Sequence, residues 1–270
     1  MLYKEFIPGD ALKPYVKCYY LFESDTNAVV EDKAFATGSM EIMFNLGTGR
    51  WQTAAGDDFS TTPPIELWGQ IIQPLTFRSL GKNTMLGIRF YPHTAAVFLH
   101  TDISLFNDQV TDVVDVTGKS VHVLHARLLD TISLNERIQL IEEFLLNRLS
   151  HFEKKPGKIT LLHSVMKELK RDDFFDNIGN VASRYGVTSR YLQKLFLQYT
   201  GLTPKLYSKI NRFQNSLQLI AKKDLSLTSI AYESGYFDQS HFIREFKSFT
   251  GFKPSAFDPE NSSAILISPN

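Results

Sequence analysis

Two stretches in the C-terminal half of the chain carry polar side chains that can hydrogen-bond to the edges of DNA bases. In each stretch they follow a glycine by a few positions and alternate with apolar residues at helical spacing. Arginine and lysine suit O6 and N7 of guanine, and glutamine suits N6 and N7 of adenine. The candidate base-reading residues are Arg190, Gln193, Lys194, Gln239, Ser240, His241 and Arg244.

The elements needed to present these residues are two helices joined by a tight turn. In the first stretch, Asp176 and Thr188 can cap the two helices, and Gly186 can adopt the positive φ that the turn requires. The second helix would bury Leu192 and Phe196 and leave its polar face outside. In helix-turn-helix proteins, residues near the N-terminus of this second helix reach base edges in the major groove.

The second stretch repeats the layout of the first. Its turn glycine, Gly235, lies 49 residues after the first, and Ser226 and Asp238 can cap the helices around it. Both stretches end alike, with TGLTP at 200–204 and TGFKP at 250–254. The sequence therefore contains an internal repeat of about fifty residues.

A long helix is predicted between the two repeats, beginning at Pro204, which suits a helix start. Its apolar residues form one continuous stripe, made of Leu206, Ile210, Phe213, Leu217 and Ile220. A helix of roughly 18 residues is ~27 Å long. Such a rod can hold two recognition helices about one turn of DNA apart, ~34 Å.

The first hundred residues predict strands. Short apolar runs such as 41–47 and 86–90 are bounded by Gly, Pro, Asn and Thr, as in an all-β sandwich or barrel. From about Thr94 the spacing becomes helical, and Ser133 and Glu136 form a capping box at the start of one helix. A helical connector is therefore expected after the β-rich part.

A charged run at 153–158, interrupted by Pro and Gly, is the predicted linker. It divides the chain into a β-rich domain with its connector, 1–152, and an all-α domain, 158–258. The tail after the second domain shows no helical pattern and is expected to be extended or loose. The fold class is thus α+β with two domains.

The overall charge of zero conceals an asymmetry between the domains. Residues 1–151 hold 12 basic and 18 acidic residues, a net of −6, whereas residues 152–257 hold 17 basic and 9 acidic, a net of +8. The tail, 258–270, adds two acidic residues. A basic half is typical of a protein with a polyanionic partner, but it is equally typical of an ordinary solvated surface. The charge alone therefore does not show whether such a partner exists.

Several classes of protein are disfavoured. No apolar run approaches the ~18 residues of a membrane span, and the first ten residues lack the apolar core of a signal peptide, which predicts a cytoplasmic protein. Cys18 is the only cysteine, and the histidines are scattered, so we expect neither a metal site nor a cofactor. Without a phosphate loop or a nucleophile elbow, no catalytic residues are predicted.

The C-terminal hundred residues resemble the DNA-binding domain of AraC/XylS regulators. The resemblance is carried by VASRYGVTSRYLQKLF at 181–196 and by IAYESGYFDQSHFIREFKSFTGFKPSAF at 230–257. It implies a double helix-turn-helix whose base-facing positions are held by six of the candidate residues: Arg190, Gln193, Lys194, Gln239, His241 and Arg244. The family pattern has Tyr-Arg after the last proline, and Ser255-Ala256-Phe257 stands here instead, which puts one phosphate contact in doubt.

Further basic residues could contact phosphates. Arg184 and Lys247 are candidates for this role, with a purely structural role as the alternative. Lys205, Lys209 and Arg212 on the long helix could also contact phosphates, or they could simply form its solvated face. His241 could cap or pack rather than read a base.

The first 150 residues resemble, over shorter stretches, the cupin-like β-barrel sensor of one branch of the same family. The matching stretches are 38–47, 68–70, 87–92 and 103–113. Family barrels bind a small effector or mediate dimerisation, and Trp51 is a further candidate for the lining of such a pocket. The predicted effector-binding residues are Glu41, Asn45, Trp68, Gln70, Arg89 and Tyr91. Each of them could instead belong to the core, with Arg89 paired with an acid.

The resemblance implies a transcriptional activator that binds promoter DNA and RNA polymerase, responds to a small effector and forms a homodimer, with no membrane partner. One alternative is a ligand-independent regulator whose barrel serves dimerisation or partner contact. Another is a metal-dependent barrel enzyme with a DNA-binding appendage.

Overall fold

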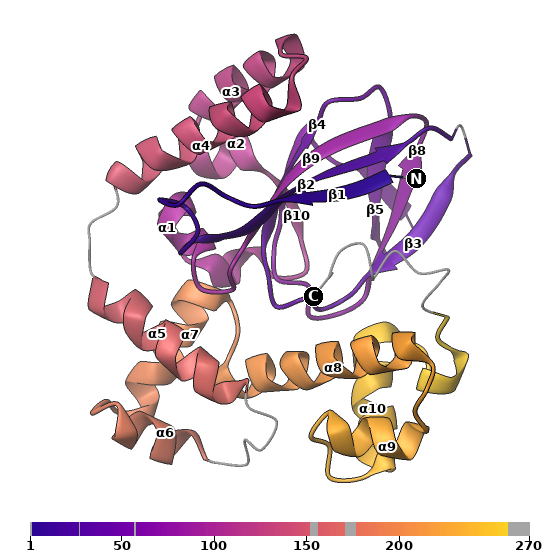
Figure 1. Cartoon of the computed structure of the whole chain (residues 1–270), viewed down its shortest axis with the longest axis vertical. Helices are drawn as coiled ribbons and strands as arrows, with labels where there is room; N and C mark the ends of the chain where they lie inside the picture. Colours follow the sequence, from indigo (N-terminus) through magenta and orange to yellow (C-terminus); the bar gives the residue numbers. More distant parts are fainter. Residues whose placement is uncertain (1, 27, 57, 152–155, 171–176, 259–270) are drawn as a thin grey trace.

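The computed structural model describes residues 2–26, 28–56, 58–151, 156–170 and 177–258 (Figure 1). The N-terminal part contains two antiparallel sheets followed by short helices, and the C-terminal part is helical. None of the described helices has the length and apolar character needed to cross a lipid bilayer. The predicted order, a β-rich domain, a helical connector and an all-α domain, is confirmed.

The larger sheet has six strands in the order β1-β2-β9-β4-β7-β10. Along one face, its alternate side chains pack against helices, and the core there includes Ile42, Phe44, Leu67, Leu86 and Ile88. The strands are β1 (Leu2–Phe6), β2 (Val16–Ser24), β4 (Glu41–Asn45), β7 (Ile65–Trp68), β9 (Asn83–Phe90) and β10 (Val110–Asp112).

The smaller sheet has four strands in the order β3-β8-β5-β6 and faces the other side of the larger sheet. The second core lies between the sheets and includes Met43, Trp51, Trp68, Phe77 and Met85. In the described residues the two sheets share no strand ladder, so the predicted cupin-like barrel is not closed. The strands are β3 (Val30–Ala34), β5 (Arg50–Ala55), β6 (Asp58–Thr61) and β8 (Leu75–Leu80).

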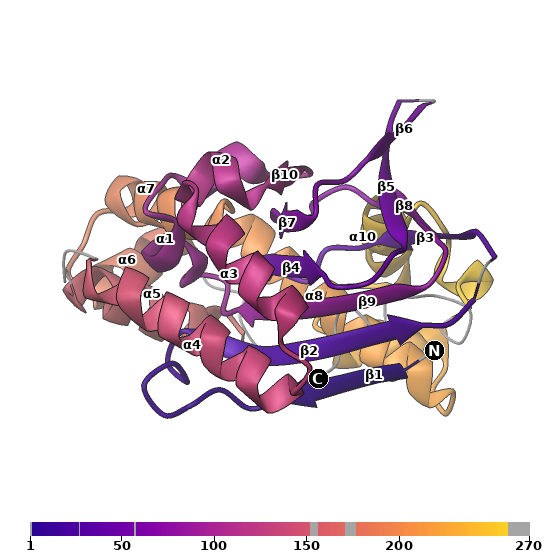
Figure 2. The same cartoon turned by 90° about the horizontal axis from the view of Figure 1, so that it is seen from above.

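Helices cover the outer face of the larger sheet (Figure 2). Thr94 is the N-cap residue of the first, and the Ser133 side chain caps the last by accepting from the amide of Glu136, as predicted. The elements are α1 (Ala95–Leu99), η1 (Ile103–Phe106), α2 (Val113–Thr117), α3 (Ser120–Asp130) and α4 (Leu134–Ser150).

The C-terminal domain consists of two helix-turn-helix units joined by the long helix α8, which runs across the molecule between them (Figure 1). Pro204 is the first residue of α8, and its buried side includes Tyr207, Ile210 and Phe213. The elements are α5 (Pro156–Leu169), α6 (Ile178–Arg184), α7 (Ser189–Thr200), α8 (Pro204–Lys222), α9 (Leu227–Glu233), α10 (Gln239–Thr250) and η2 (Pro254–Ala256).

Two local predictions need correction. The predicted linker at 153–158 lies partly outside the described residues, and its last three positions already belong to α5, because proline is compatible with the first turn of a helix. Asp176, the predicted cap of α6, also lies outside them, and Asn177 caps this helix by accepting from the amide of Gly179. The tail 259–270 lies outside them as well.

The N-terminal domain contacts both units of the C-terminal domain. The amide of Asn107, just after η1, donates to the carbonyl of Gly201 over 2.7 Å. Between β3 and β4, the Ala36 carbonyl accepts a hydrogen bond from Gln214 of α8, and the ring of Phe35 meets that of Phe257 edge-on. The N-terminal domain therefore touches the end of α7, the middle of α8 and the segment after α10.

Candidate functional site

The first unit presents three predicted base-reading residues on the exposed side of α7. The Thr188 side chain caps this helix by accepting from the amide of Tyr191, and Gly186 has φ +66° in the turn before it. The opposite side of the helix is buried, with Leu192, Leu195, Phe196 and Tyr199 in the core. Arg190, Gln193 and Lys194 are all exposed.

The second unit repeats this geometry with small differences. The Asp238 carboxylate caps α10 by accepting from the amide of His241 over 2.6 Å, and Gly235 has φ +77° in the turn. Phe242, Phe246 and Phe249 are buried. Ser240 and Arg244 are exposed, whereas Gln239 and His241 are half-buried, and Gln239 accepts a hydrogen bond from Thr228.

The two recognition helices end in the same way. Thr200 and Thr250 each donate to a carbonyl one turn earlier, and each accepts from the amide two residues later. The glycine that follows each of them has a left-handed backbone conformation, with φ +70° at Gly201 and φ +80° at Gly251. The internal repeat seen in the sequence is therefore also a repeat of structure.

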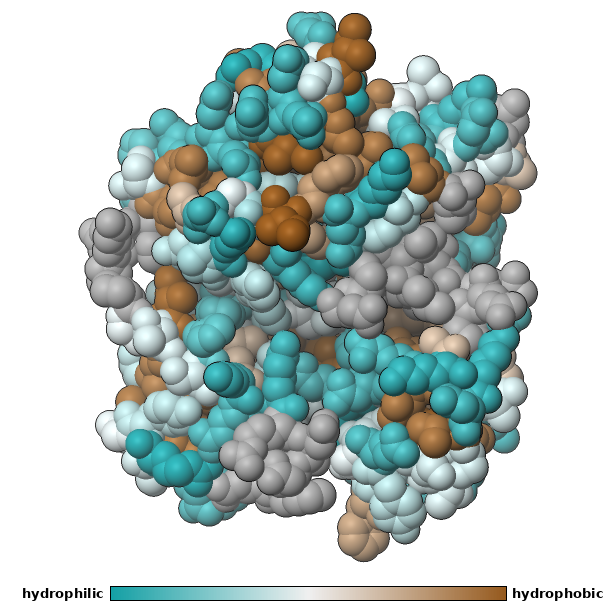
Figure 3. All heavy atoms as spheres, viewed as in Figure 1, coloured by the Kyte–Doolittle hydropathy of each residue, from teal (hydrophilic) through white to brown (hydrophobic). Residues whose placement is uncertain are grey.

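Both recognition helices end against the N-terminal domain. Gly201 at the end of α7 accepts from Asn107, and Phe252 and Phe257 after α10 lie against Lys33 and Phe35. Each recognition helix has 12 residues, about 18 Å of helix, so its N-terminal end is separated from this contact by the length of the helix. The surface of the C-terminal helices is mostly hydrophilic in this view, with small separate hydrophobic groups (Figure 3).

A buried carboxylate that the sequence analysis missed joins α8 to α10. Glu245 is 3% exposed and lies 3.1 Å from Arg212, 3.3 Å from Lys209 and 3.7 Å from His241. Lys209 and Arg212 were expected either to contact phosphates or to be solvated, and both instead pair with this carboxylate. The available signal was its spacing, three residues after Phe242 and four before Phe249, which places Glu245 on the buried face.

The two predicted phosphate contacts differ in their surroundings. Arg184, at the end of α6, forms an ion pair with Glu168 of α5. Lys247, in the last turn of α10, is exposed. The first therefore already has a structural role, and the second lies on the surface.

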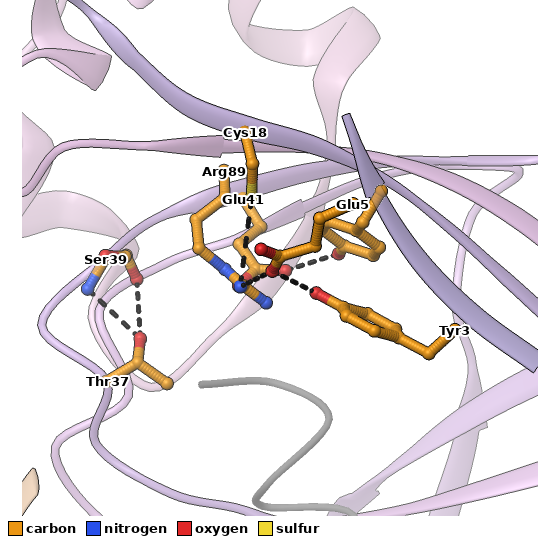
Figure 4. A network of polar contacts seen from close by, with 8 residues as sticks. Tyr3, Glu5, Cys18, Thr37, Ser39, Glu41 and Arg89 are labelled. Atoms are coloured by element: carbon orange, nitrogen blue, oxygen red, sulfur yellow. Dashed lines mark hydrogen bonds and ion pairs between the residues drawn. The ribbon is translucent and has the colours of Figure 1, made fainter. Parts of the chain in front are cut away.

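The second candidate site is a cavity between the two sheets with a polar network at one wall (Figure 4). Arg89 is 1% exposed and donates through Nε to Glu41 over 2.8 Å and through Nη1 to Glu5 over 3.0 Å. Tyr20 donates to the other oxygen of Glu41, and Tyr3 donates to Glu5. Burial and the adjacent Glu41 raise the pKa of Tyr20 well above its usual value, so this hydroxyl keeps its proton.

Strand register brings this network together. Arg89 on β9 lies directly opposite Glu41 on β4 and Cys18 on β2, and Glu41 lies opposite Trp68 on β7. Directly opposed residues share one face of a sheet, so the row points into the space between the sheets. Burial also raises the pKa of the Cys18 thiol to about 12.

Of the six predicted effector-binding residues, Glu41, Trp68 and Arg89 line the cavity, as does Trp51. The other three do not. Asn45 bonds within its own turn, to the carbonyl of Gly49 and the amide of Gly47. Gln70 is buried and donates to the carbonyl of Gly38, and Tyr91 is 36% exposed.

Strand β1 contributes two residues to this network that were not among the predicted site residues. Tyr3 and Glu5 stand two positions apart, so they project from the same face of the strand, and both join the Arg89 network. This spacing was visible in the sequence, but their meeting with Arg89 depends on the pairing of β1 with β2 and of β2 with β9.

The histidines do not gather around a common point. His125 bonds the carbonyl of Asn45 and His122 is exposed, whereas His93 is buried with its ring 5.6 Å from that of His163. Burial lowers the pKa of His93 to about 4. Among the described residues, no three His, Cys, Asp or Glu side chains are placed to hold a metal ion.

Two parts of the chain match known protein families. Residues 181–259 match the family described as a helix-turn-helix domain, and residues 4–112 match a domain of unknown function. The C-terminal part of the chain is an AraC-type helix-turn-helix domain. The resemblance on which the double helix-turn-helix was predicted is thereby confirmed.

The curated relatives of this chain are named as regulators. The chain is 34% identical over 80 residues to an uncharacterised HTH-type transcriptional regulator, YidL, of Escherichia coli strain K12, covering 30% of this chain and 27% of YidL. It is 28% identical over 123 residues to the Msm operon regulatory protein of Streptococcus mutans, covering 45% and 43%. The match thus spans less than half the length of these curated relatives.

Among solved structures, ToxT from Vibrio cholerae aligns with 88% of this chain and 96% of its own chain. The TM-score is 0.46 and the sequence identity is 15%. A probable AraC family transcriptional regulator from Rhodopseudomonas palustris aligns with 41% of this chain, at 22% identity and a TM-score of 0.33.

Proposed function

We propose that this chain is a sequence-specific DNA-binding transcriptional regulator that reads two adjacent segments of the major groove. The observation that carries the proposal is the repeated placement of two recognition helices. Both have a buried aromatic side, an exposed polar N-terminal end, and a C-terminal end against the N-terminal domain. The names of the relatives, all transcription regulators, support the same class.

In this proposal Arg190, Gln193 and Lys194 read one half of the site. The other half is read by Ser240 and Arg244, which are exposed, with Gln239 and His241 beside them. Lys247 and Arg184 contact phosphates, and Arg184 does so while paired with Glu168. The net charge of +8 over residues 152–257 favours approach to DNA and makes binding sensitive to salt.

The proposed regulator acts on promoter DNA in the cytoplasm as an activator, through contact with RNA polymerase and as a homodimer. Residues 1–152 serve as a sensor and residues 158–258 bind DNA. A small effector binds at the cavity lined by Glu41, Trp68 and Arg89. The alternative is a barrel that serves only dimerisation or partner contact. The cavity with its buried network favours effector binding over this alternative.

Selection from genomic fragments by the full chain, followed by sequencing of the bound pool, tests the proposal. We expect enrichment of one motif with two half-elements about one helical turn, ~34 Å, apart. Uniform, salt-sensitive retention of all fragments, unchanged in the double variant Arg190→Ala/Arg244→Ala, would refute sequence-specific reading.

A further inference from the structure

The cavity between the sheets has an aromatic wall and a small volume. Its apolar lining includes Tyr20, Phe22, Phe35, Trp51, Trp68 and Phe77. The volume is about 60 Å³, several times the roughly 10–15 Å³ that one water molecule needs. Such a lining suits an apolar or aromatic molecule of modest size.

Two residues that line this cavity each carry a buried donor with no hydrogen-bond acceptor among the described residues. These donors are Nη2 of Arg89, whose other nitrogens bond Glu41 and Glu5, and the indole Nε1 of Trp51. Arg89 is 1% and Trp51 is 7% exposed. Because leaving a buried donor unpaired is costly, an acceptor supplied by a ligand would be favoured here.

The charges around Arg89 select the kind of acceptor. One guanidinium already faces two carboxylates, Glu41 at 7% and Glu5 at 35% side-chain exposure. A ligand carboxylate would add a third negative charge in a largely desolvated place, which is unfavourable. A cation would bring no acceptor to the two donors. An uncharged acceptor, such as a carbonyl oxygen, avoids both penalties.

We propose that this cavity binds a small uncharged molecule with an aromatic or other apolar body and a hydrogen-bond acceptor. The acceptor meets Nη2 of Arg89 and Nε1 of Trp51, and the apolar body packs among the aromatic rings. That the bound molecule acts as an effector rests on the proposed function, whereas its binding does not.

The wall of the cavity explains how binding would be sensed. An engineered apolar cavity of about 150 Å³ holds benzene, so a ring of that size needs more room than the present volume. Strand ladders form most of the wall, but the segment 35–39 between β3 and β4 belongs to no ladder. Phe35, Thr37 and Ser39 line the cavity from this segment.

The same segment holds the DNA-binding domain. The Ala36 carbonyl accepts from Gln214, Phe35 meets Phe257, and a Cβ on Gly38 would lie 3.5 Å from Ile210. A ligand that pushes the segment outward therefore acts on α8 and on the end of the second unit. Binding can shift the balance between two domain arrangements only if the ligand favours one of them, and the enlarged cavity provides that difference.

The two tryptophans of the chain, Trp51 and Trp68, both line the cavity, so intrinsic fluorescence reports on its occupancy. The probes are benzamide, benzoate, benzylammonium and toluene, which share one ring and differ in charge and acceptor. We expect the full chain to bind benzamide about tenfold more tightly than each of the other three, because only benzamide brings an uncharged acceptor. Tighter binding of benzoate or benzylammonium, or equal binding of toluene, would overturn the proposal.

Variants at Arg89 would leave Glu41 buried without its partner and so are poorly suited to this test. Trp51→Phe keeps a ring and removes one donor, while Trp68 still reports. We expect it to weaken benzamide about fivefold and to leave toluene within about twofold, since only the hydrogen bond is lost. An equal loss for both probes would show that Trp51 only shapes the cavity and would contradict its role as a donor.

The regulatory part is tested by DNA binding of the full chain with and without saturating benzamide. A change of about threefold or more in Kd is expected, and no change would refute transmission through the segment 35–39. If the protein bound no specific DNA at all, the proposed function would fail. The fluorescence titration would still show whether the cavity binds an uncharged molecule with an acceptor.

Discussion

Arg190 and Arg244 stand at the exposed sides of the two recognition helices, where an arginine has few structural roles. Neither appears in an ion pair or side-chain hydrogen bond that the described residues form, although other basic residues of the same domain do pair with acids. A bidentate contact from arginine to guanine contributes about 1–3 kcal/mol of discrimination against other bases. Base reading is therefore expected to depend on these two residues.

Replacing either arginine tests this expectation. Arg190→Ala and Arg244→Ala should each cost ~1–3 kcal/mol on the selected site and relax discrimination at one base position, because one base contact is lost. Arg127→Ala, at an exposed arginine of α3, is the matched control and should leave binding unchanged. The measurement is a binding titration on the selected site and on single-base variants, and equal loss on random DNA would identify phosphate contacts instead.

The pKa of Glu66 predicts how the stability of the protein depends on pH. Burial raises its pKa to about 7, against an ordinary value of 4.5, although hydrogen bonds from Thr62 and Trp68 act in the opposite direction. Between pH 4.5 and 7 the unfolded chain has released this proton and the folded chain keeps it, so the contribution of Glu66 to the free energy of unfolding falls as pH rises.

Glu66→Gln removes this dependence, because the amide does not titrate. The variant should gain up to about 3 kcal/mol in stability relative to the unmodified chain as pH rises from about 4.5 to 7, with no further change above. Denaturant unfolding at a series of pH values measures the difference in stability between the two proteins. Both proteins contain His93, so its titration contributes equally to each and drops out of the difference. A difference that does not vary with pH would contradict the raised pKa.

At the scale of the elements, α8 does more than separate the two units. Its Lys209 and Arg212 reach Glu245 of α10, so the rod is fastened to the second recognition helix by a buried carboxylate. Phe213 of α8 also packs against Phe246 and Phe249 of α10. The orientation of the second recognition helix therefore depends on α8.

Glu245→Gln should destabilise this junction. The amide leaves the nearby cationic side chains without a counter-charge, and we expect a loss of about 1–3 kcal/mol in the free energy of unfolding. This lies below the usual cost of breaking a fully buried pair because Lys209 is 39% and Arg212 23% exposed. Glu233→Gln, on the exposed end of α9, should change stability by less than about 0.5 kcal/mol in the same denaturant titration.

Local signals explain which elements could be predicted. The caps Thr188, Ser226 and Asp238 lie within three residues of the amides that they accept from, so short-range patterns revealed them. Asp176 and Asn177 are adjacent polar residues, and the pattern does not distinguish them as caps. Glu245 was missed because its partners Lys209 and Arg212 lie more than thirty residues away on another helix.

At the scale of the whole molecule, the arrangement of the domains could not be predicted from the sequence. The Arg89 network joins residues up to 84 positions apart through strand register, which no local pattern specifies. The contacts of Ala36 with Gln214 and of Asn107 with Gly201 likewise depend on how the domains meet. They place the N-terminal domain against both units, so a change in this domain can reach both recognition helices.

Two recognition helices held by α8 are expected to read two half-elements of the DNA site at a fixed separation. The most direct test is the affinity of the full chain for its selected site and for versions with five or ten base pairs inserted between the half-elements. Because α8 has 19 residues and a fixed length of about 28 Å, both insertions should reduce affinity by tenfold or more. Equal affinity for all three DNAs would contradict reading by two rigidly linked units.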